Sequence, residues 1–185
     1  MKQVIVITDG DETARRAAEK AAANVGGRCI SLSGGNPTEA SAEEIAAAVK
    51  NAPGNPVLIM VDDGGLRGRG PGERILASLA GQPGIRIIGA IAVASHTDRV
   101  EGVPVKISVD RSGRTIPGAV DKEGRPRRTG RITGDTVDIL NDLDIPLVIG
   151  LGDLGKMDRA DQVEHGARVT TAAIREILRR TEGPN

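Results

Sequence analysis

The sequence predicts an α/β protein built on a doubly wound, mostly parallel five-stranded sheet. Short apolar runs alternate along the chain with segments of helical periodicity, which is typical of β-α-β units. The apolar runs contain few polar residues, which indicates strands covered by helices on both faces. Right-handed crossovers then favour the strand order 2-1-3-4-5 of flavodoxin, receiver and Toprim domains. A chain of 185 residues suits one full-sized core, so we expect a single α/β domain over residues 1–185.

Five runs rich in Val, Ile and Leu have the length of strands. The first has nothing polar between Gln3 and Thr8 and stops abruptly in the acidic sequence "DGDE". The second contains Cys29, the only cysteine, which we expect to be a small buried residue without a disulfide partner. The predicted strands cover residues 3–8, 28–33, 56–61, 85–93 and 145–151.

Four helices are predicted between and after these strands. Alanines line one face of the first helix, and Gly26 and Gly27 end it. Ser41 and Glu44 have the spacing of a capping box at the start of the second. The predicted helices cover residues 11–25, 41–51, 72–81 and 170–180.

The stretch between the fourth and fifth predicted strands departs from this alternation. It is rich in Gly, Pro and Arg, and we predict an irregular β and loop insertion over residues 98–130. Within it, "VPVKISVDRSGR" indicates an edge strand followed by a turn. Beyond it, "GDTVDILNDL" indicates a short helix.

The composition argues against nucleic acid as a partner. Lys plus Arg and Asp plus Glu both number 25, and the chain has no Phe, Tyr or Trp. A neutral chain lacks the usual basic footprint, and bases cannot stack on absent aromatic rings. No apolar run approaches the roughly 20 residues of a membrane-spanning helix, and the N-terminus becomes acidic too early for a signal peptide. We therefore expect a soluble protein, and the sequence leaves a homo-oligomer open.

Acidic residues follow three of the predicted strands. In the predicted order the first and third strands are neighbours, so their carboxyl ends would bring the acids into one crevice. Clustered carboxylates repel one another unless a cation or protons intervene, and Mg²⁺ or Ca²⁺ prefers oxygen ligands. The alternative is that these acids cap helices, start turns or face water. The candidate metal ligands are Asp9, Asp11, Asp62, Asp63 and Asp153.

Three further polar residues extend this candidate crevice. Ser95 and Thr97 follow the fourth predicted strand, and Lys156 follows the fifth. Acids, a hydroxyl and a lysine in these places resemble the phosphoacceptor site of receiver domains, which predicts an Mg²⁺-dependent phosphoryl-transfer protein as an alternative function. The acidic strand ends also resemble the Toprim domain of nucleic-acid enzymes, which is a second alternative.

A glycine-rich loop follows the third predicted strand. Its sequence "GGLRGRGPGE" combines glycines with Arg67 and Arg69, so it could cradle an anion near the start of the next helix. It lacks the Gly-Lys-Ser/Thr ending of a P-loop. The alternative is a flexible turn with solvated arginines.

Seven phrases, in order over nearly the whole chain, resemble the stage V sporulation protein AE family in its soluble form. The longest runs from Gly130 to Met157 and is unlike other doubly wound proteins. The phrases are "VIVITDGDE", "GGRCISLSGGNPT", "PVLIMVDDGG" with "GPGE" after it, "GAIAVASHT", "VDKEG", "GRITGDTVDILNDLDIPLVIGLGDLGKM" and "GARVTTAAIREIL".

This resemblance implies a non-enzymatic accessory protein of bacterial sporulation. The family's operon partners move dipicolinic acid, with calcium, across the spore inner membrane during sporulation and germination. The implied partners are therefore other stage V sporulation proteins, with dipicolinate or calcium as candidate ligands. The implied location is the spore, peripheral to the inner membrane. The resemblance carries over no catalytic residues.

Overall fold

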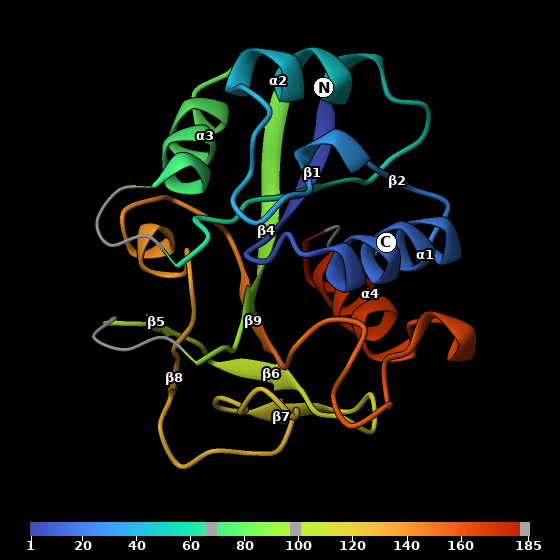
Figure 1. Cartoon of the computed structure of the whole chain (residues 1–185), viewed down its shortest axis with the longest axis vertical. Helices are drawn as coiled ribbons and strands as arrows, with labels where there is room; N and C mark the ends of the chain where they lie inside the picture. The colour runs from blue at the N-terminus through green and yellow to red at the C-terminus, as the bar shows by residue number, and fades with distance from the viewer. Residues whose placement is uncertain (66–69, 97–100, 182–185) are drawn as a thin grey trace.

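The structure, a computed structural model, describes residues 1–65, 70–96 and 101–181, and its centre is a seven-stranded, mostly parallel sheet (Figure 1). This architecture confirms the predicted fold class. The strands of the large sheet are β1 (Lys2–Ile7), β2 (Arg28–Cys29), β3 (Val57–Met60), β4 (Ile85–Val93), β6 (Ile107–Val109), β7 (Thr115–Pro117) and β9 (Val148–Leu151). A small second sheet pairs β5 (Val103–Pro104) with β8 (Arg131–Ile132).

The strand order differs from the predicted 2-1-3-4-5. The sheet runs β2-β3-β1-β4-β9-β6-β7, so β3 lies between β2 and β1. The first crossover skips one strand position, and β3 later fills the gap. Both orders put the two-residue β2 at an edge and the fully apolar β3 inside the sheet, so they differ in the side of β1 on which β3 pairs. The nine-residue β4 pairs with β1 over the whole length of β1, from Lys2 to Ile7, which leaves the other side of β1 to the shorter β3, paired from Val4 to Ile7. The relation on which the acidic crevice depends is kept, because β1 and β3 pair directly.

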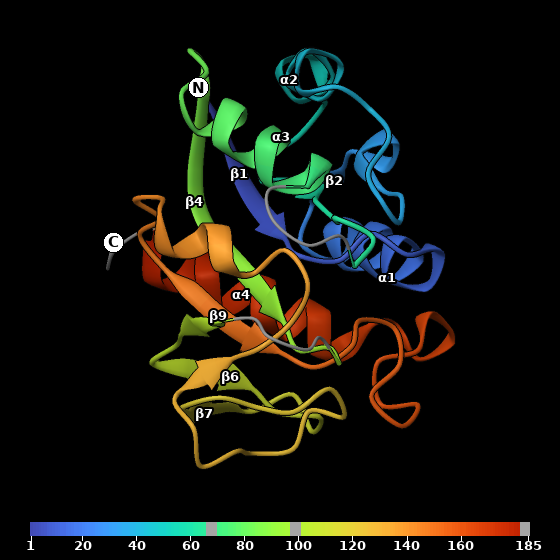
Figure 2. The ribbon, with the colours of Figure 1, turned by 60° about the vertical axis from the view of Figure 1, so that its left-hand side comes forward.

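Helices cover both faces of the sheet, as predicted. The helices α2 (Ala42–Asn51) and α3 (Pro71–Ala80) pack on one face, and α1 (Glu12–Asn24) and α4 (Arg168–Thr181) pack together on the other (Figure 2). Each face has its own aliphatic core. The Ser41–Glu44 capping box is present at the start of α2. Among the described helices, none is long and apolar enough to cross a bilayer.

The predicted second strand, residues 28–33, is shorter than expected. Strand pairing ends at Cys29, and a 3₁₀ helix, η1 (Ser31–Ser33), follows. The Ser33 hydroxyl donates to the Ile30 carbonyl at 2.6 Å and accepts from the Met60 amide at 2.9 Å. The Ser33 side chain thus provides a hydrogen bond to β3 where backbone pairing between the two strands has ended. Cys29 is buried, as predicted.

The stretch after β4 extends the sheet rather than leaving it. Strand β6 pairs in parallel with β9 and antiparallel with β7, so the predicted strand is present but β7, not β6, is at the edge. The sheet therefore exceeds the five predicted strands. The predicted short helix is the 3₁₀ helix η2 (Asp138–Asn141). This segment returns the chain to the carboxyl end of the sheet, next to the loops that follow β3 and β4.

Candidate functional site

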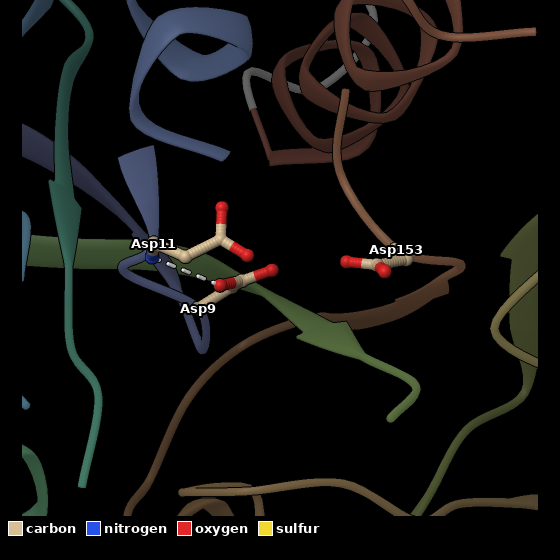
Figure 3. A group of neighbouring side chains, drawn as sticks. All are labelled: Asp9, Asp11 and Asp153. Atoms are coloured by element: carbon tan, nitrogen blue, oxygen red, sulfur yellow. Dashed lines mark hydrogen bonds between the residues drawn. The ribbon is translucent and has the colours of Figure 1, made fainter. Parts of the chain in front are cut away.

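Three carboxylates converge at the carboxyl ends of the parallel strands. Asp9 and Asp11 lie in the turn between β1 and α1, and Asp153 follows β9. Each offers a carboxylate oxygen, and these oxygens all lie within 4.8 Å of one another. Asp153 points across from its own loop toward the other two (Figure 3). We call these three residues the acid triad.

The turn that carries Asp9 and Asp11 is shaped by the start of α1. Asp11 is the N-cap of α1, and its Oδ1 accepts the amide of Ala14 at 2.8 Å. Asp9 Oδ1 in turn accepts the amide of Asp11 at 3.2 Å. The helix cap engages Oδ1 of Asp11 and leaves Oδ2 to accept a hydrogen bond from Lys156. The prediction that Asp11 caps a helix is therefore correct, and Asp11 both caps α1 and belongs to the acid triad.

Lys156 is the cation that the fold itself places at the acid triad. Its Nζ lies 2.9 Å from Oδ2 of Asp11 and 3.2 Å from Oδ2 of Asp153. Burial lowers the pKa of Lys156, but its two carboxylate partners outweigh burial, so the pKa is raised. Among the described residues, Lys156 is the cation paired with the triad, and Lys122 adds an attraction to Asp153, so the three ionised acids still outnumber the positive charges.

The pKa values of the three carboxyls reflect both their burial and this shortage of positive charge. Burial, together with repulsion from Asp11 and Asp153, raises the pKa of Asp9 to about 7. Burial also raises the pKa of Asp153 despite Lys156. Burial acts in the same direction on Asp11, but the Ala14 amide and Lys156 outweigh it and lower the pKa. Near neutral pH, the Asp9 carboxyl is therefore present in both its protonated and its ionised form.

Asp62 lies beside the acid triad, and both of its carboxylate oxygens accept hydrogen bonds from backbone amides. Its Oδ2 accepts the amide of Gly10 at 3.0 Å, and its Oδ1 accepts the amide of Gly64 at 2.7 Å. The residue is buried, and burial together with repulsion from Asp135 raises its pKa to about 6. Asp62 therefore ties the turn after β1 to the turn after β3.

Asp63 serves the next helix. Its Oδ1 accepts the amides of Gly72 at 2.8 Å and Glu73 at 3.2 Å, in the first turn of α3. This supplies the acceptor that the N-cap of α3, Gly70, has no side chain to provide. Burial raises the pKa of Asp63. Asp63 is not among the three clustered carboxylates, and its hydrogen bonds stabilise α3.

Sequence reasoning missed Asp135, which connects the loops at this end of the sheet. Its Oδ2 accepts the amide of Gly65 at 2.6 Å, and its own amide donates to Oγ of Ser95 at 3.0 Å. The following Thr136 has a positive φ of 61° and accepts the amide of Asp63 at 3.0 Å. The acidic "GDT" in "GRITGDTVDIL" was the available signal, but nothing local places it beside β3.

Of the other predicted site residues, the structure describes Ser95 and Lys156 but not the remaining three. Ser95 is exposed and bonds to the loop of Asp135 rather than to the acid triad. Lys156 joins the triad, as described above, and not Asp62 or Asp63. The remaining three, Thr97, Arg67 and Arg69, lie outside the described residues.

The acid triad has the donor set of a hard-cation site. Carboxylate oxygens are the ligands that Ca²⁺ and Mg²⁺ prefer, and three of them from two chain segments can hold one ion with water completing its coordination. A divalent cation would neutralise Asp9 in its ionised form and displace the ammonium of Lys156. The residues present therefore fit such an ion.

Fold and site together define a class: an α/β protein with a doubly wound sheet and an acidic crevice at the carboxyl ends of its strands. The comparisons with known proteins then narrow this class. The family model described as Stage V sporulation protein AE1 matches residues 3–181, and the chain belongs to this sporulation-related family. Searches of curated proteins and of solved structures found no significant match.

Proposed function

We propose that this protein is a non-enzymatic accessory component of dipicolinic acid transport in sporulation and germination, and that it acts by binding a divalent cation at the acid triad. The triad of Asp9, Asp11 and Asp153 is the single observation that carries the cation binding. Family membership supports the setting in sporulation. Ca²⁺ is favoured over Mg²⁺ because calcium accompanies dipicolinate in the spore.

The location and partners of the protein belong to the same proposal. We place it in the spore, peripheral to the inner membrane, in contact with other stage V sporulation proteins of its operon. Cross-linking in sporulating cells, followed by mass spectrometry, tests this part. Cross-links to those proteins support it, and cross-links confined to copies of the same chain support a homo-oligomer instead.

Thermal unfolding with added ions tests the cation site. A ligand that binds only the folded state raises Tm as its concentration rises. We expect Ca²⁺ to raise Tm, with Mg²⁺ weaker, and dipicolinate alone to have no effect through the triad. The double variant Asp9→Asn/Asp153→Asn should lose the response. Asp144→Asn, at an exposed residue outside the triad, should keep it. No shift with either ion contradicts the cation site and leaves the family assignment intact.

The phosphoacceptor alternative has less support. A receiver domain needs an accessible acceptor aspartate beside the metal ligands and the lysine. Here Asp62 and Asp63 are both buried and hydrogen-bonded to amides, and Lys156 pairs with other acids. Incubation with acetyl phosphate tests it: a mass increase of one phosphoryl group that is lost in Asp62→Asn/Asp63→Asn would revive this alternative. The Toprim alternative is tested by salt-dependent DNA binding, which the neutral charge disfavours.

A further inference from the structure

Asp161 is a fully buried acid that is not part of the acid triad. It ends the loop after β9 (residues 152–161) and also reaches the start of α4. Its Oδ1 accepts the amides of Val169 at 2.8 Å and Thr170 at 2.9 Å. Its Oδ2 accepts the amide of Gly155 at 2.9 Å and the hydroxyl of Thr170 at 2.6 Å. One oxygen therefore serves α4 alone, and the other also holds the loop.

Capping α4 does not by itself require an acid in this place. Helices α1 and α2 take their acceptors from the residues directly before them, Asp11 and Ser41. Helix α4 takes its acceptor from Asp161, which η3 (Val163–His165) separates from it. Burying a carboxylate is costly unless hydrogen bonds replace the water that it loses. The remote, buried position of Asp161 is explained if the acid also has to hold the loop.

The loop that Asp161 holds also touches α1. Gly155 has a φ of 73°, and a Cβ there would lie 2.8 Å from the carbonyl oxygen of Thr13. Glycine therefore meets two needs at this position, the left-handed backbone and the close approach. Thr13 lies in the first turn of α1, the helix that Asp11 caps. The loop is thus held between Asp161 on one side and the start of α1 on the other.

The path of the loop after Lys156 needs such support. Three consecutive residues have positive φ values: Met157 at 49°, Asp158 at 51° and Arg159 at 71°. This conformation is unfavourable for residues with a Cβ and persists where the surroundings fix it. The amide of Asp161 donates to the carbonyl of Lys156 at 3.3 Å, which closes the run. Both the side chain and the backbone of Asp161 therefore hold the loop in place.

We propose that Asp161 is the positioning residue of the acid triad. Through Gly155 it holds the loop in which Asp153 and Lys156 lie on either side of that glycine. A shift at Gly155 would move both side chains away from Asp11 (Figure 3). Residues that orient metal ligands without touching the metal commonly set its affinity. The effect on calcium rests on the proposed cation site, whereas the effect on the Lys156–Asp11 ion pair needs no ion.

Asp161→Asn separates the loop contact from the helix contacts. The variant keeps one acceptor oxygen and replaces the other with an NH₂ group. The oxygen should face the amides of Val169 and Thr170, because the reverse orientation would oppose two amide donors instead of one. The NH₂ group then faces the amide of Gly155 and cannot accept its hydrogen bond. The variant should therefore keep the cap of α4 and release the loop.

Isothermal titration calorimetry with Ca²⁺ gives the first readout. Asp161→Asn should raise the Kd for Ca²⁺ by about 10–100-fold. Asp63→Asn is the matched control, because it makes the same change at another buried aspartate that bonds the start of a helix, and it should leave the Kd unchanged. An unchanged Kd in Asp161→Asn, or an equal rise in both variants, would overturn the proposal. If the unmodified protein binds no calcium, the cation site is wrong and the second readout decides the role of Asp161.

Acetylation of Lys156 gives this second readout without any ion. An ion-paired ammonium reacts slowly, so Asp161→Asn should acetylate Lys156 severalfold faster, as measured by mass spectrometry. Exposed Lys20 on α1 is the internal reference. Gly155→Ala displaces the loop from the side of α1 and should also speed the reaction, which keeps the test valid if Asp161→Asn misfolds. An unchanged ratio of the two lysine rates in the folded variant contradicts the proposal, whether or not the protein binds calcium.

Discussion

The Nζ atom of Lys156 lies 2.9 Å from Oδ2 of Asp11, so a lysine that follows β9 neutralises the N-cap of the helix that follows β1. The same ammonium reaches Asp153 at 3.2 Å. A cation on the chain thus occupies the position in which a divalent ion would neutralise the acid triad. Without an added ion, Lys156 thus neutralises part of the acid triad, so removing it should change how the triad responds to calcium.

Lys156→Met should make the protein more responsive to calcium. Without added ions, loss of two partly exposed ion pairs should lower the free energy of unfolding by about 1 kcal/mol. With Ca²⁺, the rise in Tm should exceed that of the unmodified protein, because the triad gains one net negative charge. Lys20→Met, on the exposed side of α1, is the matched control and should respond like the unmodified protein. A smaller calcium response in Lys156→Met contradicts the idea that the lysine and the ion compete.

Asp9 should make stability fall as pH rises. Its pKa is about 7 in the folded protein against an ordinary value of 3.8, so between these values the folded state holds a proton that the unfolded state has released. Folding is therefore favoured at the lower end of this window, and the contribution is lost as pH rises toward 7, at up to about 1.4 kcal/mol per pH unit. Urea unfolding should show a smaller loss between pH 5 and pH 8 in Asp9→Asn than in the unmodified protein. Parallel pH profiles for the two would rule this out.

Asp63→Ala should destabilise α3 without changing the calcium response. The substitution leaves the amides of Gly72 and Glu73 without their acceptor, which should lower the free energy of unfolding by about 1–3 kcal/mol. Asp63→Asn retains an acceptor oxygen and should lose less. Urea unfolding gives the stability, and the shift in Tm with Ca²⁺ gives the ion response. Loss of that response in a folded Asp63→Ala protein would extend the cation site to Asp63.

Asp135→Asn should lower the pKa of Asp62. Burial and repulsion from Asp135 together hold that pKa at about 6, and the substitution removes the repulsion while burial remains. The new pKa should therefore lie below 6 and above the ordinary 3.8. Carbon-detected NMR titration of the Asp62 carboxyl measures it directly. An unchanged midpoint would mean that the two carboxyls do not interact in solution.

Gly10→Ala should disturb the turn that presents the acid triad. A Cβ at Gly10 would overlap the Gly35 carbonyl oxygen and lie 2.9 Å from Cβ of Asp62, and neither neighbour is the end of a flexible chain. We expect a loss of about 1–3 kcal/mol in the free energy of unfolding and a weaker calcium response, because the turn must shift. Differential scanning calorimetry with and without Ca²⁺ checks both. A calcium response equal to that of the unmodified protein would show that the triad tolerates the shift.

Much of this arrangement could be predicted from local sequence. The apolar run before Asp9 predicts a buried strand whose acids lie at its end, and Ser41 with Glu44 predicts the start of α2, because both depend on residues within one or two turns. The meeting of acids from β1 and β9 also follows from parallel strands, whose carboxyl ends lie at one edge. Family membership was predicted from phrases spread over the chain and confirmed by the match to residues 3–181.

Tertiary structure alone decided the rest. Whether β3 lies between β2 and β1 or between β1 and β4 depends on packing over the whole sheet, because both orders use the same strands. The acids have separate roles: Asp63 accepts amides at the start of α3, and Asp62 accepts the amide of Gly10. These roles depend on loops that meet only after folding. Asp135 reaches the carboxyl end of the sheet through a loop that returns from far along the chain. Local patterns encode what a residue prefers, but which distant partner satisfies it is settled by packing.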